Sequence, residues 1–112
     1  MTKVMGIIRE QTLDGVIERL SLIGVRGLTI GLVSGAGRSR GHRAVFRGSA
    51  YSVDLLPKVM LEWVGPDDEA DAVVRAIAQR AMTGKIGDGK IFVLHVEEAV
   101  RIRTGERGLE AV

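Results

Sequence analysis

The chain has 112 residues, of which 46% are hydrophobic and 27% are charged, the usual balance of one folded domain. It has no cysteine, which excludes disulfides and thiolate metal sites, and no apolar run approaches the roughly 20 residues of a membrane helix. The net charge of +2 is too small to indicate nucleic-acid binding by itself. We therefore expect a cytoplasmic protein that neither binds nucleic acid nor inserts into a membrane.

The first part of the chain predicts a strand, a helix and a second strand. Residues 3–9, rich in Val, Ile and Met, predict the first strand. Apolar residues at helical spacing then predict one face of a helix, made of Leu13, Val16, Ile17, Leu20 and Ile23. Gly24 and Gly27 supply stop and turn signals, and residues 28–33 predict the second strand.

A long insert, residues 37–55, shows neither a helical nor a strand period. Its basic side chains are Arg38, Arg40, His42, Arg43 and Arg47. A loop of this length in a small domain is usually functional or disordered. Two interpretations remain open, namely a mobile arm that reaches a partner and a solvated flexible hairpin.

The second half of the chain repeats the strand–helix–strand order. Residues 59–64 alternate, with Glu62 on the face opposite to three apolar side chains, Val59, Leu61 and Trp63. Pro66 ends this strand, and the acidic residues in 67–71 favour the start of a helix. The apolar face of that helix is predicted from Ala70, Val73, Val74, Ile77 and Ala81. Residues 91–96 predict the fourth strand.

This element order predicts an α+β fold of the ferredoxin-like, split βαβ type (βαββαβ), with a long loop between the halves. Right-handed crossovers would place both helices on one face of an antiparallel sheet. The other face would remain bare and aliphatic in a monomer, which is unfavourable in water. We therefore expect residues 1–112 to form a single domain that assembles into a closed homo-oligomer.

The glycine-rich stretch TGKIGDGK, residues 83–90, predicts an anion site. Gly84, Gly87 and Gly89 would allow consecutive backbone amides to turn inward and form an anion-binding nest. Two lysines add positive charge on its flanks. The alternative is a plain tight turn between a helix and a strand, because a lone glycine-rich loop is a weak signal.

The segment VRIRTGERG carries a second cationic pair. If the segment is extended, Arg101 and Arg103 point to the same side and can both engage a polyphosphate. The alternative is a hairpin turn and a charged tail. No set of residues looks catalytic, and His42 and His95 lack metal-ligand spacing, so we do not expect an enzyme.

Three stretches, RGSAYSVDLLPKV, TGKIGDGKIFV and VEEAVRIRTGERG, closely resemble the PII signal-transduction proteins, the nitrogen-regulatory family. The resemblance runs from the first strand to the C-terminus. It implies a homotrimer whose sheets face inward and whose inter-subunit clefts bind ATP and ADP in competition. It also implies that the insert, about 37–55, is a mobile T-loop that docks on protein targets, a membrane transporter or a metabolic enzyme.

The resemblance assigns nucleotide-binding roles to several positions of this sequence. The positions that match those around the base and ribose are Thr29, Gly37, Arg38, Glu62 and Val64. The positions that match the phosphate-binding ones are Gly87, Asp88, Gly89, Lys90, Arg101 and Arg103. The phosphate-binding loop would span about 82–90, and a C-terminal segment would span 97–112. Tyr51 matches the position that is uridylylated in many members.

The sequence departs from the family pattern at the base of the T-loop. Ser39 replaces a glutamine that helps to hold Mg²⁺ and 2-oxoglutarate, Arg40 replaces a lysine, and Ala36 replaces a large apolar residue. Phe46 stands where a tyrosine is common. The positions implied for 2-oxoglutarate are Arg9, Ser39, Arg40, Gly41, Lys58 and Gly87. We expect ATP and ADP to bind, Mg²⁺ to accompany ATP with Ser39 as the one candidate protein ligand, and 2-oxoglutarate to bind weakly.

Other functions were weighed against that of a nucleotide-sensing regulator. A slow ATPase would use the same cleft, but the sequence supplies no clear water-activating base. A nucleic-acid binder would use the arginines of the insert, but no aromatic stacking platform accompanies them. A divergent regulator of a transporter outside nitrogen metabolism is the remaining alternative.

Overall fold

The structure, a computed structural model, describes residues 1–35, 43–46, 49–52 and 56–112. Between residues 36 and 55 it describes only the backbone of two strands. Gly37, Arg38, Ser39, Arg40 and Gly41, all assigned to ligand sites by the resemblance, therefore lie outside the described residues.

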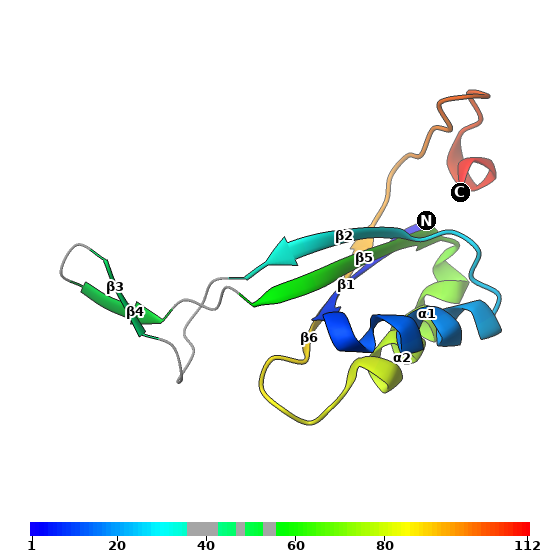
Figure 1. The fold of residues 1–112 in the computed structure, drawn as a ribbon. Coiled ribbons are helices and arrows are strands. Elements are labelled where there is room, and N and C mark those ends of the chain that lie inside the picture. Colours follow the sequence, from blue (N-terminus) through cyan, green and yellow to red (C-terminus); the bar gives the residue numbers. More distant parts are fainter. Residues whose placement is uncertain (36–42, 47–48, 53–55) are drawn as a thin grey trace.

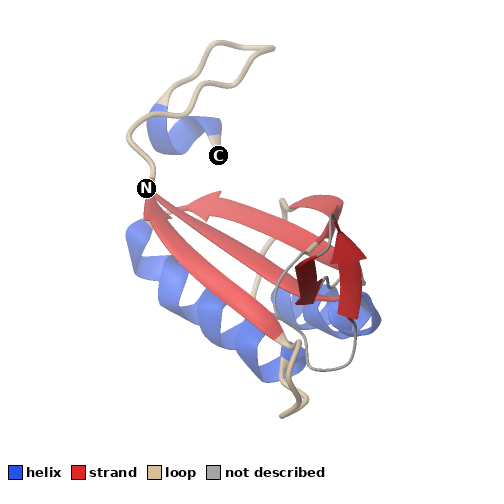
Figure 2. Cartoon of the chain, turned by 90° about the vertical axis from the view of Figure 1, so that its left-hand side faces the viewer, coloured by secondary structure: helices blue, strands red, loops and turns tan. Residues whose placement is uncertain are grey.

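The main body is a four-stranded antiparallel sheet with two helices on one face (Figures 1 and 2). Its strands lie in the order β2-β5-β1-β6, which matches the predicted ferredoxin-like arrangement. The strands are β1 (Thr2–Arg9), β2 (Thr29–Ser34), β5 (Pro57–Gly65) and β6 (Gly89–His95). The helices are α1 (Leu13–Leu22) and α2 (Asp67–Ala81), with short 3-10 turns η1 (Glu10–Thr12) and η2 (Gly108–Ala111).

The core lies between the helices and one face of the sheet, because alternation along each strand sends every second side chain to that face. Val59, Leu61 and Trp63 of β5 are buried there, as predicted, and Glu62 lies on the opposite face. The remaining large members of the core are Val4, Ile8, Val16, Leu20, Val73 and Ile77. The helical faces predicted from the sequence are thus confirmed in α1 and α2.

One member of the predicted α1 face is not part of the core. Ile23 is 40% exposed, because α1 ends at Leu22 and the chain then turns through Gly24, whose φ is +93°. A glycine with positive φ is the common terminator of a helix, so the apolar residue just before it can lie outside the last buried turn. The prediction for Ile23 was therefore wrong.

The sheet face away from the helices remains uncovered, as predicted (Figure 2). Among its side chains, Phe92 and Leu94 of β6 are 44% and 45% exposed. Met5, Ile7, Met60 and Val64 on β1 and β5 share this face, together with the ion pair of Lys3 and Glu62. The described chain therefore carries an apolar surface of the kind that protein association buries.

The insert contains two strands, which the sequence did not predict. β3 (Arg43–Phe46) and β4 (Ser49–Ser52) form an antiparallel pair, with Phe46 opposite Ser49. The pair forms a sheet separate from the main one. Both strands are only four residues long, and residues 37–55 show no alternating pattern that would have predicted them.

Candidate functional site

The loop between α2 and β6 is organised around one carboxylate. Asp88 accepts hydrogen bonds from the backbone amides of Thr83 (2.7 Å) and Gly84 (2.9 Å), and from the Thr83 hydroxyl. The Thr83 hydroxyl, with these amides and the Arg9 guanidinium, holds the pKa of Asp88 well below its ordinary value. Asp88 is consequently ionised at neutral pH inside its own loop.

The loop needs glycine where it enters β6. Gly84, Gly87 and Gly89 have φ values of +84°, +104° and +104°, a region that L side chains rarely adopt. At Gly89 a Cβ atom would also lie 1.7 Å from the carbonyl oxygen of Ile7, so no other residue fits without moving β1. The glycine requirement read from the sequence is therefore a property of the backbone.

Two cationic side chains on the uncovered sheet face, Arg9 and Lys58, bind the loop between α2 and β6. The Arg9 guanidinium donates to the Ile86 carbonyl oxygen (2.6 Å) and to the Asp88 carboxylate (3.2 Å). The Lys58 ammonium donates to the Gly87 carbonyl oxygen. Arg9 and Lys58, two of the positions predicted for 2-oxoglutarate, are thus already engaged with the loop.

These contacts correct one prediction about the anion nest. The amide of Gly84 donates to Asp88, so it is not free to receive a phosphate, and the three-glycine nest was wrong in that part. Gly89 and Lys90, the first two residues of β6, are exposed, whereas Gly87 is half-buried and its carbonyl oxygen accepts from Lys58. An anion would therefore approach where the loop enters β6.

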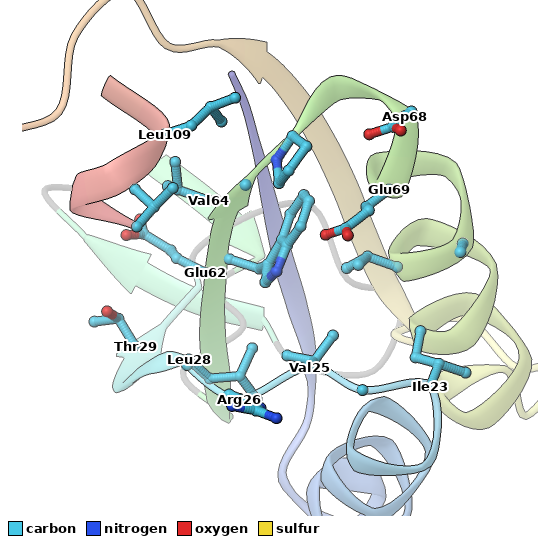
Figure 3. Close-up of a pocket in the computed structure, with 18 residues that line it drawn as sticks. Ile23, Val25, Arg26, Leu28, Thr29, Glu62, Val64, Asp68, Glu69 and Leu109 are labelled. Carbon is cyan, nitrogen blue, oxygen red and sulfur yellow. The ribbon is translucent and has the colours of Figure 1, made fainter. Parts of the chain in front are cut away.

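A pocket of about 720 Å³ lies at the other end of the sheet (Figure 3). The β2–β5 ladder ends at the pair Thr29↔Glu62, whereas β5 continues to Gly65 and pairs there only with β1 among the described strands. The pocket surrounds this uncovered strand edge. It contains Thr29, Glu62 and Val64, the described residues predicted around the base and ribose.

The pocket has apolar walls and an acidic rim. Leu28 and Val64 line it beside the strand edge, and Asp68 and Glu69 at the start of α2 lie on the rim (Figure 3). Glu62 is neutralised by the Lys3 ammonium, whose nitrogen lies 3.0 Å from the carboxylate. The walls therefore suit a flat, largely apolar group that also makes a few polar contacts at the strand edge.

The indole of Trp63 forms part of the pocket wall and restricts its neighbour. A Cβ atom on Gly65 would lie 2.3 Å from the indole ring, which itself is only 7% exposed. Trp63 therefore fits against the sheet only because residue 65 has no side chain.

The C-terminal segment also reaches this pocket, through Leu109 and Val112. Before them, residues 98–108 form what we call the C-terminal hairpin, closed by a bridge between Val100 and Arg107. The hairpin turns back sharply at residues 102–104, so Arg101 and Arg103 do not lie in an extended strand. The prediction that Arg101 and Arg103 point to the same side required an extended segment, and this segment is not extended.

Within the C-terminal hairpin the two arginines differ in their contacts. The Arg101 guanidinium pairs with the Glu106 carboxylate and donates to the Glu110 carbonyl oxygen (3.0 Å). Arg103 is exposed. The sequence did not predict roles for Glu106 or for Thr83 in the loop between α2 and β6. The acidic residue five positions after Arg101 was a possible signal for the first of these.

One chain does not bring the two predicted halves of the site together. Thr29 lies on β2 and the residues from Gly87 to Lys90 lie at β6, and β2 and β6 are the two outer strands of the sheet. Three strand spacings of about 4.8 Å, or roughly 14 Å, separate these two strands, and the two halves are also offset along the strand direction. Tyr51 lies on β4, opposite Ala44, and its side chain is outside the described residues.

Two further classes of site were examined in the described part of the chain. There, no group of three His, Asp or Glu side chains is placed to hold a metal ion. None of the helices among the described residues is long and apolar enough to cross a membrane.

Comparison with known proteins gives a consistent result over the whole chain. Residues 1–106 match the family described as "Nitrogen regulatory protein P-II". A protein of that name from Haemophilus influenzae is 54% identical over 112 residues, which are all of both chains. Proteins of the same name from Rhizobium meliloti and Cereibacter sphaeroides are 51% and 52% identical over the same full lengths.

Proposed function

Because the chain belongs to the P-II family of nitrogen regulatory proteins, whose name describes regulators rather than enzymes, we propose that it senses adenine nucleotides. In this proposal ATP and ADP compete for clefts between neighbouring subunits of a homotrimer. The insert, residues 37–55, acts as the T-loop and transmits the nucleotide state to a cytoplasmic face of a transporter or to a metabolic enzyme.

The observation that carries the proposal is the placement of two half-sites on opposite outer strands. The pocket with Thr29 and Glu62 lies at the β2 side of the sheet, and the loop with Gly87 and Lys90 lies at the β6 side. A ligand with a flat base and a polyphosphate chain needs both halves. Two copies that place the β2 side of one against the β6 side of the next would supply them together.

The uncovered apolar sheet face supports such an assembly. Phe92 and Leu94 would cease to be exposed if the sheets of several copies faced one another. Burial of apolar area is favourable by about 25 cal/mol per Å², so such a face can drive association by itself. A closed ring of copies also repeats the same cleft at every interface.

The chemistry of each half fits one part of the nucleotide. The apolar pocket at an uncovered strand edge suits a purine, whose rim carries both donors and acceptors that a backbone can read. The exposed Lys90 and the amides near Gly87 and Gly89 suit phosphate. Mg²⁺ would be held mainly by the phosphates and by water, because the described residues offer it no ligand cluster.

The contacts of Arg9 and Lys58 support a weak response to 2-oxoglutarate. Both cations already donate to carbonyl oxygens of the phosphate-binding loop, or to Asp88, so a dicarboxylate would have to displace these bonds. Ser39 adds to this reasoning at the sequence level, because a serine hydroxyl is shorter than a glutamine amide and is a weaker metal ligand. The protein would then report the balance of ATP and ADP.

Calorimetric titration combined with light scattering tests the proposal. We expect a trimer mass, binding of ATP and of ADP with one site per chain, and weak or undetectable 2-oxoglutarate binding in saturating Mg-ATP. Lys90→Ala should weaken both nucleotides, and Ser39→Gln should strengthen 2-oxoglutarate. A monomer that binds no nucleotide would refute the proposal, and tight 2-oxoglutarate binding unchanged by Ser39→Gln would refute its last part.

A further inference from the structure

The Arg101 guanidinium makes two contacts within its own segment. It pairs with the Glu106 carboxylate and donates to the Glu110 carbonyl oxygen at 3.0 Å. A guanidinium binds carboxylate and phosphate oxygens through the same planar fork of N–H donors. An arriving phosphate and the Glu106 carboxylate would therefore compete for one set of donors.

The pair is placed where such an exchange is physically possible. The side chains of Arg101 and Glu106 are 40% and 39% exposed, so neither is locked in the core. A half-exposed ion pair contributes little to the stability of the folded chain, because water and salt screen the two charges. A polyphosphate carries more charge than one carboxylate and can replace it.

The hairpin does not depend on this ion pair for its shape. The Arg101 amide donates to the Glu106 carbonyl oxygen (2.9 Å), and the Gly105 amide donates to the Arg101 carbonyl oxygen (2.8 Å). The Gly108 amide donates to the Ala99 carbonyl oxygen (2.9 Å), and Glu98 binds the same amide through its side chain (3.2 Å). Removing the charge of Glu106 should therefore leave the turn in place.

We propose that Glu106 is an internal competitor of phosphate, which holds Arg101 in the ligand-free protein and sets how tightly phosphate-bearing ligands bind. The proposal rests on the proposed nucleotide function and adds to it a residue that determines specificity. When Arg101 turns to a phosphate it also leaves the Glu110 carbonyl, which lies next to Leu109 in the wall of the base pocket. The exchange thus links the phosphate end of the ligand to the pocket that surrounds its base.

The competition predicts that removing Glu106 increases nucleotide affinity, which a purely structural role of this residue would not do. Losing the competitor frees Arg101, so Glu106→Gln should bind ATP and ADP about two- to five-fold more tightly, the range expected for a half-exposed ion pair. Adenosine carries no phosphate, so its affinity should not change. A residue that only supported the hairpin would instead weaken every ligand when replaced.

A matched variant separates the competition from a general change of charge. Glu110→Gln removes the same charge from the same segment, but Glu110 contacts Arg101 only through its backbone carbonyl oxygen. We expect Glu110→Gln to shift ATP affinity much less than Glu106→Gln does. Dissociation constants for ATP, ADP and adenosine would be measured by calorimetry on the full-length native protein, the two glutamine variants and Arg101→Ala, at one ionic strength.

The outcomes distinguish this inference from the function on which it rests. If Arg101→Ala weakens ATP but Glu106→Gln leaves it unchanged or weaker, only the competitor role is overturned. If Glu110→Gln strengthens ATP as much as Glu106→Gln, the effect is general electrostatics, and the inference is likewise overturned. If the native protein binds no nucleotide, the proposed function fails, and the competitor role fails with it.

Discussion

The loop between α2 and β6 and the C-terminal hairpin each hold one carboxylate beside a group that we propose binds phosphate, but they hold it differently. Asp88 is bound by two backbone amides, a hydroxyl and Arg9. Glu106 is bound by a single half-exposed guanidinium. Backbone donors cannot turn away from Asp88 without unfolding the loop, whereas Arg101 can rotate toward another acceptor.

This difference separates a structural anion from an exchangeable one. Asp88 fixes the shape of the loop before any ligand arrives. Glu106 keeps an arginine occupied until something more negative arrives. A carboxylate bound by N–H donors therefore makes the loop around Asp88 rigid, whereas in the C-terminal hairpin it competes with a ligand for Arg101.

The strongest test of the rigid region is Gly89→Ala. The added Cβ meets the Ile7 carbonyl oxygen at 1.7 Å and the φ of +104° is unfavourable, so we expect a loss of about 3 kcal/mol or more in the free energy of unfolding. Gly84→Ala is the matched control, because it has a φ of +84° but no atom within 4 Å of the new Cβ. That control should cost about 1 kcal/mol. Equal losses in urea unfolding would show that the close approach to β1 does not matter.

The exchangeable region is tested by Arg101→Ala and Arg103→Ala. Each should weaken ATP binding by about 1.5–3 kcal/mol, because a charge-assisted contact to phosphate is removed. Adenosine binding, measured by the same calorimetry, should stay close to native. Parallel losses for ATP and adenosine would mean that these arginines do not touch phosphate.

The acid side of the stability profile tests Asp88. Its folded pKa lies below the ordinary value of 3.8, so the unfolded chain binds the proton more readily. The stabilisation from Asp88 is therefore present above about pH 4 and is lost as the pH falls through the interval down to the folded pKa. Asp88→Asn should be less stable than native at pH 7 and should lose less stability between pH 4 and pH 2. Parallel stability curves for the two proteins over this interval would contradict the assigned role.

The smallest expected effect is that of Thr83→Val. The hydroxyl of Thr83 is the largest cause of the lowered pKa of Asp88, and valine removes it with little change of shape. The Asp88 carboxyl should then titrate closer to its ordinary value, as followed by carboxyl-carbon NMR, while the amide bond from residue 83 keeps part of the shift. An unchanged titration would assign the shift to the backbone amides and Arg9 and would contradict the role of the hydroxyl.

The sequence predicted the fold well because burial leaves a periodic trace. The β5 face of Val59, Leu61 and Trp63 and the two helical faces all follow from spacing. The β3–β4 ribbon and the exposed position of Ile23 did not follow, because neither is fixed by packing against the core. Hydrogen bonds between paired strands and the ends of helices depend on backbone geometry. The spacing of hydrophobic residues in the sequence does not indicate that geometry.

The site was predictable in its residue types but less so in its contacts. The glycine stretch indicated a special backbone at residue 89, and the positive φ of Gly89 and its close approach to the Ile7 carbonyl oxygen account for that signal, although Gly89 and Lys90 begin β6 and are not part of the loop. The pairing of Glu106 with Arg101 and of Thr83 with Asp88 depends on how each turn folds. Such pairs are local in sequence, but no pattern of apolar residues marks them.

The packing of Trp63 over Gly65 constrains how the pocket can evolve. Residue 65 cannot acquire even a methyl group while the indole lies over it, because the new atom would be 2.3 Å from the ring. A smaller side chain at residue 63 would remove that obstacle and would also widen the pocket wall. Substitutions at this pair therefore have a fixed order, in which residue 63 must become smaller before residue 65 can acquire a side chain.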